Sequence, residues 1–210
     1  ILTALSFIER VAAFYDKKQK LGSIKLPTPQ DYVDRYISDF YQFDLLYRKA
    51  LEAHHKLTSE VIPILSALEQ RKNQLDIDYA SFANDLNVEW LDCVIDGGSY
   101  FDTLSIPKQE NFYQREYGDT DGKSKLVVII SDALRYEVAQ ELLESLGREK
   151  HIAKLSVQRA MLPTETKYCK QAMLPYQRLT LVNDNGKVDM AVDGQVLSLI
   201  EDRSQHPVSY

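Results

Sequence analysis

Cysteine is scarce in this 210-residue chain, which has two, Cys93 and Cys169. The two stand far apart and match no metal-ligand spacing, so a cysteine-based zinc site is not indicated. A small secreted domain held by disulfides is not indicated either, because such domains are dense in cysteine. The cysteine content predicts a reducing, cytoplasmic compartment and free thiols.

Long apolar runs and an excess of positive charge are also absent. No stretch approaches the ~20 apolar residues of a transmembrane helix, and no secretory signal is visible, so we expect no membrane partner. The formal net charge of −6 gives no overall electrostatic case for nucleic-acid binding, although a local basic groove is compatible with it. With 44% hydrophobic and 27% charged residues, the composition is that of a globular protein that buries a core.

The first 95 residues show the periodicity of amphipathic helices, with apolar positions three and four residues apart. Thr28 is suited to cap one of these helices, and Pro29 to occupy its first turn. Aromatic residues line one face of this helix, which predicts packing between helices, with a stacking platform or a partner groove as the alternative. The predicted helices lie at about 2–21, 29–50, 58–75 and 79–94.

The pattern then changes. Residues 96–123 are rich in turn formers and predict a connector between an α-helical region at 1–95 and an α/β region at 124–210. The run 126–130 is apolar on both faces, which predicts a central strand with parallel neighbours. The elements predicted after it are a helix at 133–146 capped by Gly147, a strand at 152–160, a hairpin at 179–192 and a tight turn at Asp193-Gly194.

Asp132 directly follows the predicted strand 126–130. The carboxyl ends of strands in open α/β sheets are where ligands bind, so this carboxylate is well placed to hold a metal ion or a polar substrate. The other interpretation is that Asp132 caps the helix that follows. The strand–aspartate–helix pattern alone leaves both open.

Two threonines, Thr164 and Thr166, stand where a short helical stretch is predicted to begin. A hydroxyl there can cap the helix, or it can attack a phosphate drawn to the helix start. Attack requires activation by a base or a metal, and Asp132 is the residue that could hold that metal.

Cys169 is an alternative nucleophile in the same segment, with Lys167 and Lys170 nearby to lower the pKa of its thiol. No histidine partner is apparent, and a buried structural cysteine is the commoner case. The sequence therefore favours a threonine over Cys169 as the nucleophile.

The segment from Val127 to Glu137, the turn Leu162-Pro163-Thr164-Glu165-Thr166 and the sequence Met173-Leu174-Pro175 together resemble the PglZ domain of bacterial phage-exclusion (BREX) defence systems. That domain is similar to the alkaline phosphatase superfamily. The resemblance covers about residues 124–200, and the helical region is similar in character to the segment that precedes this domain. It implies a helical region followed by the first part of an alkaline-phosphatase-like α/β sandwich.

The resemblance also implies roles for individual residues. An aspartate that ends the first core strand binds a divalent metal in the superfamily, and a threonine or serine at the start of a later helix is the nucleophile. By this resemblance, Asp132 and Thr166 are metal ligands. Thr166 is also the nucleophile, and Thr164 is the alternative nucleophile. Arg135 receives a weaker role in contacting phosphate, and Glu137 a supporting one. The expected cofactor is zinc or another transition metal, held in the complete protein by further ligands downstream.

The implied function is that of a metal-dependent phosphoesterase or phosphodiesterase in antiviral defence. A nucleic-acid phosphodiester is the possible substrate, and other phage-exclusion proteins are the expected partners. The alternative is a non-catalytic scaffold that docks other defence-system subunits.

Two expectations concern this chain by itself. Asp132 and Thr166 should lie on one edge of a sheet, with oxygens within roughly 4–5 Å if they share a metal. Because only these two of the expected site residues are present, we expect a segment of a longer protein that is catalytically silent alone. Exposed apolar sheet surface should favour its self-association or a partner.

Overall fold

The computed structural model describes residues 2–57, 64–96, 104–117, 127–184 and 186–196. Contacts divide the chain into a helical unit, residues 1–105 and 135–153, and a second unit, residues 106–134 and 154–210. Segment 135–153 thus groups with the N-terminal helices, whereas the sequence places it in the α/β region; the domain division itself stays a prediction. None of the helices in the described ranges is both long and apolar enough to cross a membrane.

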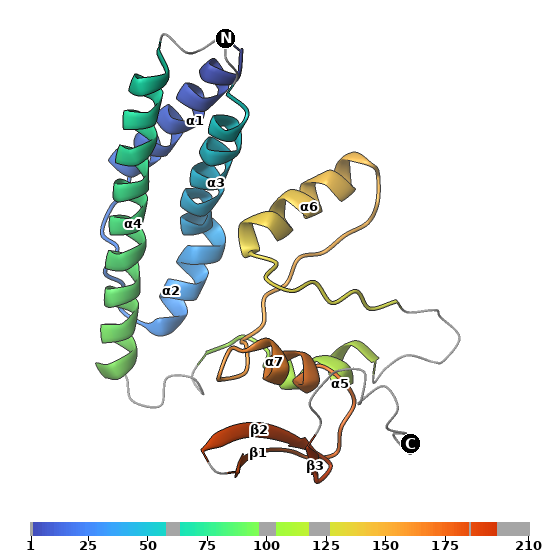
Figure 1. The fold of residues 1–210 in the computed structure, drawn as a ribbon. Coiled ribbons are helices and arrows are strands. Elements are labelled where there is room, and N and C mark those ends of the chain that lie inside the picture. The colour runs from blue at the N-terminus through green and yellow to red at the C-terminus, as the bar shows by residue number, and fades with distance from the viewer. Residues whose placement is uncertain (1, 58–63, 97–103, 118–126, 185, 197–210) are drawn as a thin grey trace. The chain divides into compact units, whose positions relative to one another are not determined.

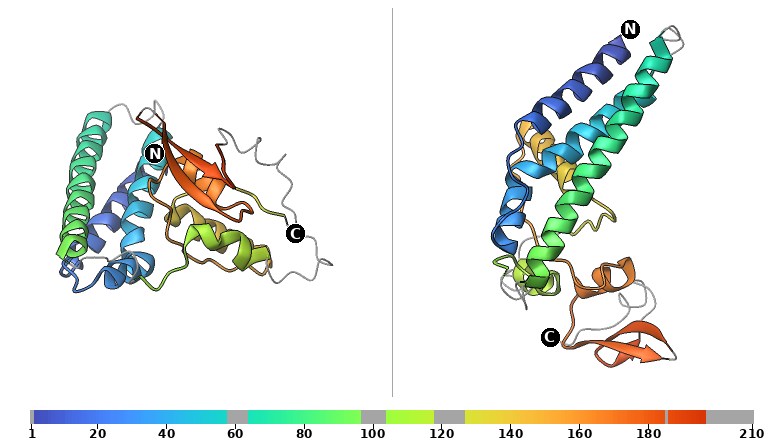
Figure 2. Two further views of the ribbon diagram at one scale, coloured as in Figure 1. Left: turned by 90° about the horizontal axis from the view of Figure 1, so that it is seen from below. Right: turned by 90° about the vertical axis from the view of Figure 1, so that its left-hand side faces the viewer.

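The helical unit is centred on α3 (Tyr41–His55), which lies against three other helices. Figures 1 and 2 show α3 running beside α1 and α4, which agrees with the contacts between them. The other helices of this unit are α1 (Leu2–Gln19), α2 (Pro29–Arg35), α4 (Leu65–Asp96) and α6 (Tyr136–Arg148).

Aromatic side chains form the core of the helical unit. The rings of Phe43 and Phe82 lie with centroids 4.2 Å apart, and each fully buried side chain of this size contributes about 1.5–3 kcal/mol. The prediction that the aromatic stripe packs between helices is confirmed at Tyr32, Phe40 and Phe43, which are buried. The largest fully buried apolar side chains of this core are Phe7, Phe14, Phe40, Phe43 and Leu75.

The predicted start of the second helix is confirmed. The Thr28 hydroxyl accepts a hydrogen bond from the backbone N–H of Asp31, and the Asp31 carboxylate accepts one from the backbone N–H of Thr28. This reciprocal pair satisfies donors that a helix start leaves open. A π-helical segment, η1 (Tyr36–Phe40), then joins α2 to α3, so the helix continues through a widened turn to His55.

The prediction of separate helices at 58–75 and 79–94 is wrong where the structure describes them, because α4 is continuous from Leu65 to Asp96. Residues 58–63, where the first of the two was expected to begin, lie outside the described residues. The expected break near Asp78 does not occur, since no glycine or proline is present there. Tyr15 and Lys18 of α1 instead donate to the Asp78 carboxylate at 2.8 and 2.7 Å.

The ends of α6 also differ from the prediction. The helix begins at Tyr136, and Gly147, the predicted cap, lies inside it. The left-handed residue after the helix is Lys150, with φ of 64°, and its N–H donates to the Gly147 carbonyl at 3.0 Å. The helix thus ends two residues later than expected, at Arg148, and the left-handed residue comes three residues later.

The predicted hairpin is confirmed in the second unit. β1 (Leu179–Asp184) pairs antiparallel with β2 (Lys187–Val192), and β3 (Gln195–Val196) adds to β2. Asp193 and Gly194 have φ of 51° and 85°, as a tight hairpin turn of the type I′ family requires.

The remaining helices of the second unit are η4 (Gln109–Asn111), α5 (Phe112–Tyr117) and α7 (Thr166–Ala172). Tyr168 of α7 is buried in a small core with Met190 and Val192 of β2. Its hydroxyl donates to the backbone carbonyl of Val188. The hairpin therefore holds α7 in place.

The strands predicted at 126–130 and 152–160 are wrong. Residues 127–130 carry no strand, and the side chains of Val127 and Ile129 are 79% and 87% exposed; Leu126 lies outside the described residues. Of the segment 152–160, Arg159 alone forms a bridge, to Lys108. A strand persists only with a hydrogen-bonded neighbour; the described residues supply none for 127–130, and for 152–160 they supply only the single bridge at Arg159. These ranges show a mixed helical fold with a three-stranded antiparallel sheet, and no parallel α/β sandwich.

Candidate functional site

Asp132 and Thr166, the two residues of the expected site, lie together in the second unit. Asp132 sits in a turn, and its carboxylate accepts a hydrogen bond from the N–H of Ala133 at 3.1 Å. It does not cap α6, whose N-cap residue is Arg135. Thr166 is the first residue of α7, and its hydroxyl is 3.2 Å from Asp132 Oδ2 and 3.4 Å from Oδ1.

The Thr166 hydroxyl does not cap α7, because it bonds to the Asp132 carboxylate and not to a backbone N–H of the first helical turn. The N-cap residue of α7 is Glu165, whose side chain makes no cap hydrogen bond. Thr166 instead donates to a carboxylate 34 positions earlier in the chain. Thr164 lies two residues before Thr166 and is exposed, and Thr166 is the threonine that contacts Asp132.

Lys170 completes this group, although the sequence indicates for it only an effect on Cys169. Its Nζ lies 3.2 Å from Asp132 Oδ2, the same oxygen that the Thr166 hydroxyl contacts. Thr166 and Lys170 are four residues apart on α7, so they share one face of the helix. That spacing is the signal by which the sequence could have revealed Lys170.

The electrostatics follow from this arrangement. The hydrogen bond from Lys170 and its positive charge lower the pKa of Asp132 below its ordinary value, with smaller contributions from the Thr166 hydroxyl and the Ala133 N–H. Asp132 is therefore ionised at neutral pH. An ionised carboxylate accepts the hydroxyl proton of Thr166 in a charge-assisted hydrogen bond and is a suitable cation ligand.

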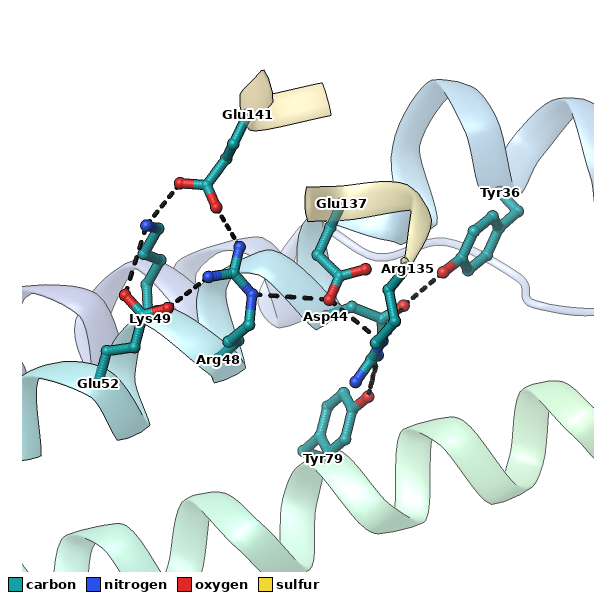
Figure 3. A network of polar contacts seen from close by, with 9 residues as sticks. All are labelled: Tyr36, Asp44, Arg48, Lys49, Glu52, Tyr79, Arg135, Glu137 and Glu141. Atoms are coloured by element: carbon teal, nitrogen blue, oxygen red, sulfur yellow. Dashed lines mark hydrogen bonds and ion pairs between the residues drawn. The ribbon is translucent and has the colours of Figure 1, made fainter. Parts of the chain in front are cut away.

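Arg135 lies in the helical unit, in the polar network of Figure 3. Its guanidinium faces Glu137 at 3.1 Å, the Tyr79 hydroxyl at 3.4 Å and Asp44 at 3.5 Å. The hydroxyls of Tyr36 and Tyr79 also donate to Asp44, at 2.5 and 2.7 Å. Burial, followed by the hydrogen bond to Asp44, raises the pKa of Tyr36, and burial is the largest cause that raises the pKa of Tyr79, to about 12.

The rest of this network joins α6 to α3. Glu137 of α6 is completely buried and lies 3.6 Å from Nε of Arg48. Glu141, one turn further along α6, pairs with Arg48 and Lys49 (Figure 3). Two acidic residues four apart thus face two basic residues of α3. This charge spacing is visible in the sequence, but nothing in it shows that the two helices meet.

Cys169 is held in a way that does not activate it. Its thiol contacts the backbone carbonyl of Met161 at 3.6 Å, and burial raises the pKa of the thiol. A raised pKa keeps the sulfur protonated, and the thiolate is the nucleophilic form. Lys170, which was considered as an activator of Cys169, contacts Asp132 instead.

The donor set for a metal is small. Asp132 and Thr166 offer a carboxylate and a hydroxyl, which suit a divalent cation. Among the described residues, no three histidine, cysteine, aspartate or glutamate side chains gather as a metal site. His206 lies outside the described residues.

Comparison with known proteins adds to the geometry. Residues 113–207 match the family described as the BREX system PglZ alkaline phosphatase-like domain. No solved structure gives a significant match.

Two curated relatives match most of the chain. The alkaline phosphatase-like protein PglZ of Bacillus cereus (strain H3081.97) is 29% identical over 164 residues, 76% of this chain and 18% of the relative. The alkaline phosphatase-like protein BrxZ of Escherichia coli O9:H4 (strain HS) is 31% identical over 176 residues, 80% of this chain and 20% of the relative. The chain thus spans about a fifth of the length of these relatives. These matches place the chain in the PglZ family of BREX systems, with its alkaline-phosphatase-like domain at residues 113–207.

Proposed function

We propose that this chain supplies the nucleophile and the first metal ligand of a metal-dependent phosphoester hydrolase that acts in bacterial defence against phage. The observation that carries the proposal is the 3.2 Å contact between Thr166 Oγ1 and Asp132 Oδ2, inside the region that matches the PglZ domain. An exposed hydroxyl held by an ionised carboxylate has the access and the orientation that a nucleophile needs.

Thr166 is the nucleophile in the proposed reaction. Its Oγ1 forms a bond to phosphorus while the bond from phosphorus to the leaving alcohol breaks, and the hydroxyl proton ends on that alcohol. Water then cleaves the bond between Oγ1 and phosphorus and restores the hydroxyl. Thr164 is the alternative nucleophile, since it precedes α7 in the same turn.

Asp132 and Thr166 are also the residues that would hold the divalent cation, which we propose is zinc or another transition metal. A bound cation of this kind lowers the pKa of a hydroxyl and stabilises the charge on a phosphate. Asp132 contributes a carboxylate that stays ionised and orients Thr166. Two donors are fewer than such an ion takes, so the proposal requires further ligands from the whole protein.

The proposed substrate class is a nucleic-acid phosphodiester, and the proposed partners are other phage-exclusion proteins in the cytoplasm. The match to a BREX-system domain supports this context. Arg135 is a weaker candidate for contacting the phosphate, because substrate binding would require its guanidinium to leave Glu137 and Asp44.

A non-catalytic scaffold is the second candidate function. The exposed apolar side chains of Val127 and Ile129 favour it, because exposed apolar segments serve as docking surfaces. A scaffold would use the same helices and hairpin without any turnover at Thr166.

Turnover measurements on the whole protein that carries this chain separate the two functions. We expect hydrolysis of bis(4-nitrophenyl) phosphate in the presence of zinc or manganese, and loss of it by at least about 100-fold in Asp132→Ala and Thr166→Ala. Thr164→Ala tests the alternative nucleophile, and it should keep activity if Thr166 is the residue that attacks phosphorus. A folded protein without turnover under any divalent metal would support the scaffold and overturn the hydrolase.

A further inference from the structure

Lys170 is the charged neighbour of the proposed site whose role is unassigned. Its ammonium and the Thr166 hydroxyl both contact Oδ2 of Asp132, each at 3.2 Å. The carboxylate is largely exposed, so a surface ion pair here contributes little to stability. The ion pair therefore does little to stabilise the fold. It places the Lys170 ammonium against Asp132, the carboxylate that is proposed as a metal ligand.

We propose that Lys170 is the resident counter-ion of Asp132, that it yields this carboxylate to a divalent cation, and that it then contacts the phosphoryl oxygens beside Thr166. This inference rests on the proposed function. It assigns Lys170 to the site as a phosphate-binding and positioning residue.

Charge and reach support the exchange. An ammonium and a divalent cation repel each other on one carboxylate oxygen, so both cannot stay at Oδ2. The lysine side chain has a flexible four-carbon stem and can swing its charge by several ångströms without moving α7. Because Lys170 Nζ and Thr166 Oγ1 share a contact atom, a phosphate that reacts with Thr166 lies within reach of the displaced ammonium.

Lys167 provides a matched comparison on the same short helix. Its ammonium donates to the Val188 carbonyl at 2.9 Å and lies over the Tyr168 ring, 4.5 Å from the centroid. It thus serves the packing of α7 on the hairpin. Replacing Lys167 removes the same charge from α7 without changing the contacts of Asp132.

The first experiment measures metal binding alone, in the whole protein that carries this chain, because that protein supplies the further ligands the site requires. Mn²⁺ is titrated into ¹⁵N-labelled protein, and its affinity is read from paramagnetic broadening of the amide signals of Ala133 and Thr166. Loss of the competing charge in Lys170→Met should strengthen Mn²⁺ binding on the order of three- to tenfold, whereas Lys167→Met should leave it close to wild type. Asp132→Asn should abolish the local broadening.

The outcomes separate this inference from the proposed function. Equal affinities in wild type, Lys170→Met and Lys167→Met, all lost in Asp132→Asn, would overturn the role of Lys170 and leave the metal site standing. Broadening that does not depend on Asp132, or a wild type without any local broadening, would overturn both.

The second experiment tests the phosphate contact in the whole protein loaded with metal. Binding of inorganic phosphate should weaken by about fivefold to tenfold in Lys170→Met, because a charge-assisted hydrogen bond is lost. Lys167→Met should bind phosphate like the wild type, and Lys170→Arg should bind it nearly as well. Unchanged phosphate affinity in Lys170→Met would overturn the assignment.

Discussion

At the level of single residues, two carboxylates each bind several hydrogen-bond donors from other parts of the chain. Asp132 gathers a hydroxyl and an ammonium on one oxygen, and Asp78 gathers donors from two helices. In both cases the neighbours stabilise the charged form. The two sites differ in exposure: Asp78 joins α1 to α4 inside the helical unit, whereas Asp132 holds an exposed hydroxyl, that of Thr166.

Asp78 gives a prediction on pH. Hydrogen bonds from Lys18, Gln74 and Tyr15 lower the pKa of Asp78 from 3.8 to about 2. Because the folded-state pKa is the lower one, the stabilisation is present above pH 4 and is lost as the pH falls toward 2. It should amount to about 1 kcal/mol after solvent screening.

Urea unfolding at several pH values measures this contribution. The free energy of unfolding of wild type should exceed that of Asp78→Asn above pH 4, and the difference should shrink steadily as the pH falls toward 2. Asp85→Asn, exposed on the same helix, is the control. A difference that does not change with pH would contradict the assignment.

At the scale of elements, predictions that rest on local signals were reliable. The cap at Thr28 and the tight turn at Gly194 depend on neighbours in the chain, and both were predicted correctly. The strands predicted at 126–130 and 152–160 would need hydrogen-bonded neighbours from elsewhere in the chain, which an apolar run does not reveal. The packing of α6 on α3 was not predictable, because it depends on which helices meet.

The proximity of Asp132 and Thr166 was expected from their predicted places on one edge of a sheet, and their distance lies within the expected range. The described residues contain no such sheet edge at these two positions. A turn and a short helix bring them together instead. Lys170 was missed as a member of the group because its partner lies 38 positions away.

The contact between α6 and α3 gives a second prediction. Glu137→Ala should lower the free energy of unfolding by about 2 kcal/mol, because Arg48 and Arg135 lose a buried partner but keep their other carboxylates. Glu144→Ala, exposed on the same helix, should change it by less than about 0.5 kcal/mol. Chemical denaturation compares the two variants, and equal effects would show that the network does not hold α6.

At the scale of the whole molecule, segment 127–130 is an exposed apolar segment without a strand beside it in the described residues. Val127 and Ile129 present apolar side chains with no strand beside them in the described residues. The family match places this segment inside the PglZ domain, and the relatives are a little more than four times as long as this chain. We therefore expect the segment to find an apolar partner.

Self-association of the chain is the corresponding prediction. Ile129→Lys should weaken association at least about tenfold, because burying one isoleucine contributes about 1.5–3 kcal/mol. Ile77→Lys, which replaces a singly exposed isoleucine of α4, should have little effect. Sedimentation equilibrium measures both. A wild-type chain that stays monomeric at high concentration would contradict this expectation.

Thr166, held by Asp132, is the proposed nucleophile toward phosphorus. Peptide mass spectrometry of the whole protein, acid-quenched while it turns over a phosphodiester, detects the intermediate that this role requires. We expect a phosphoryl adduct on Thr166 that is absent in Thr166→Val and strongly reduced in Asp132→Ala, while both variants stay folded. Turnover that continues in Thr166→Val, or an adduct on Thr164 alone, would contradict it.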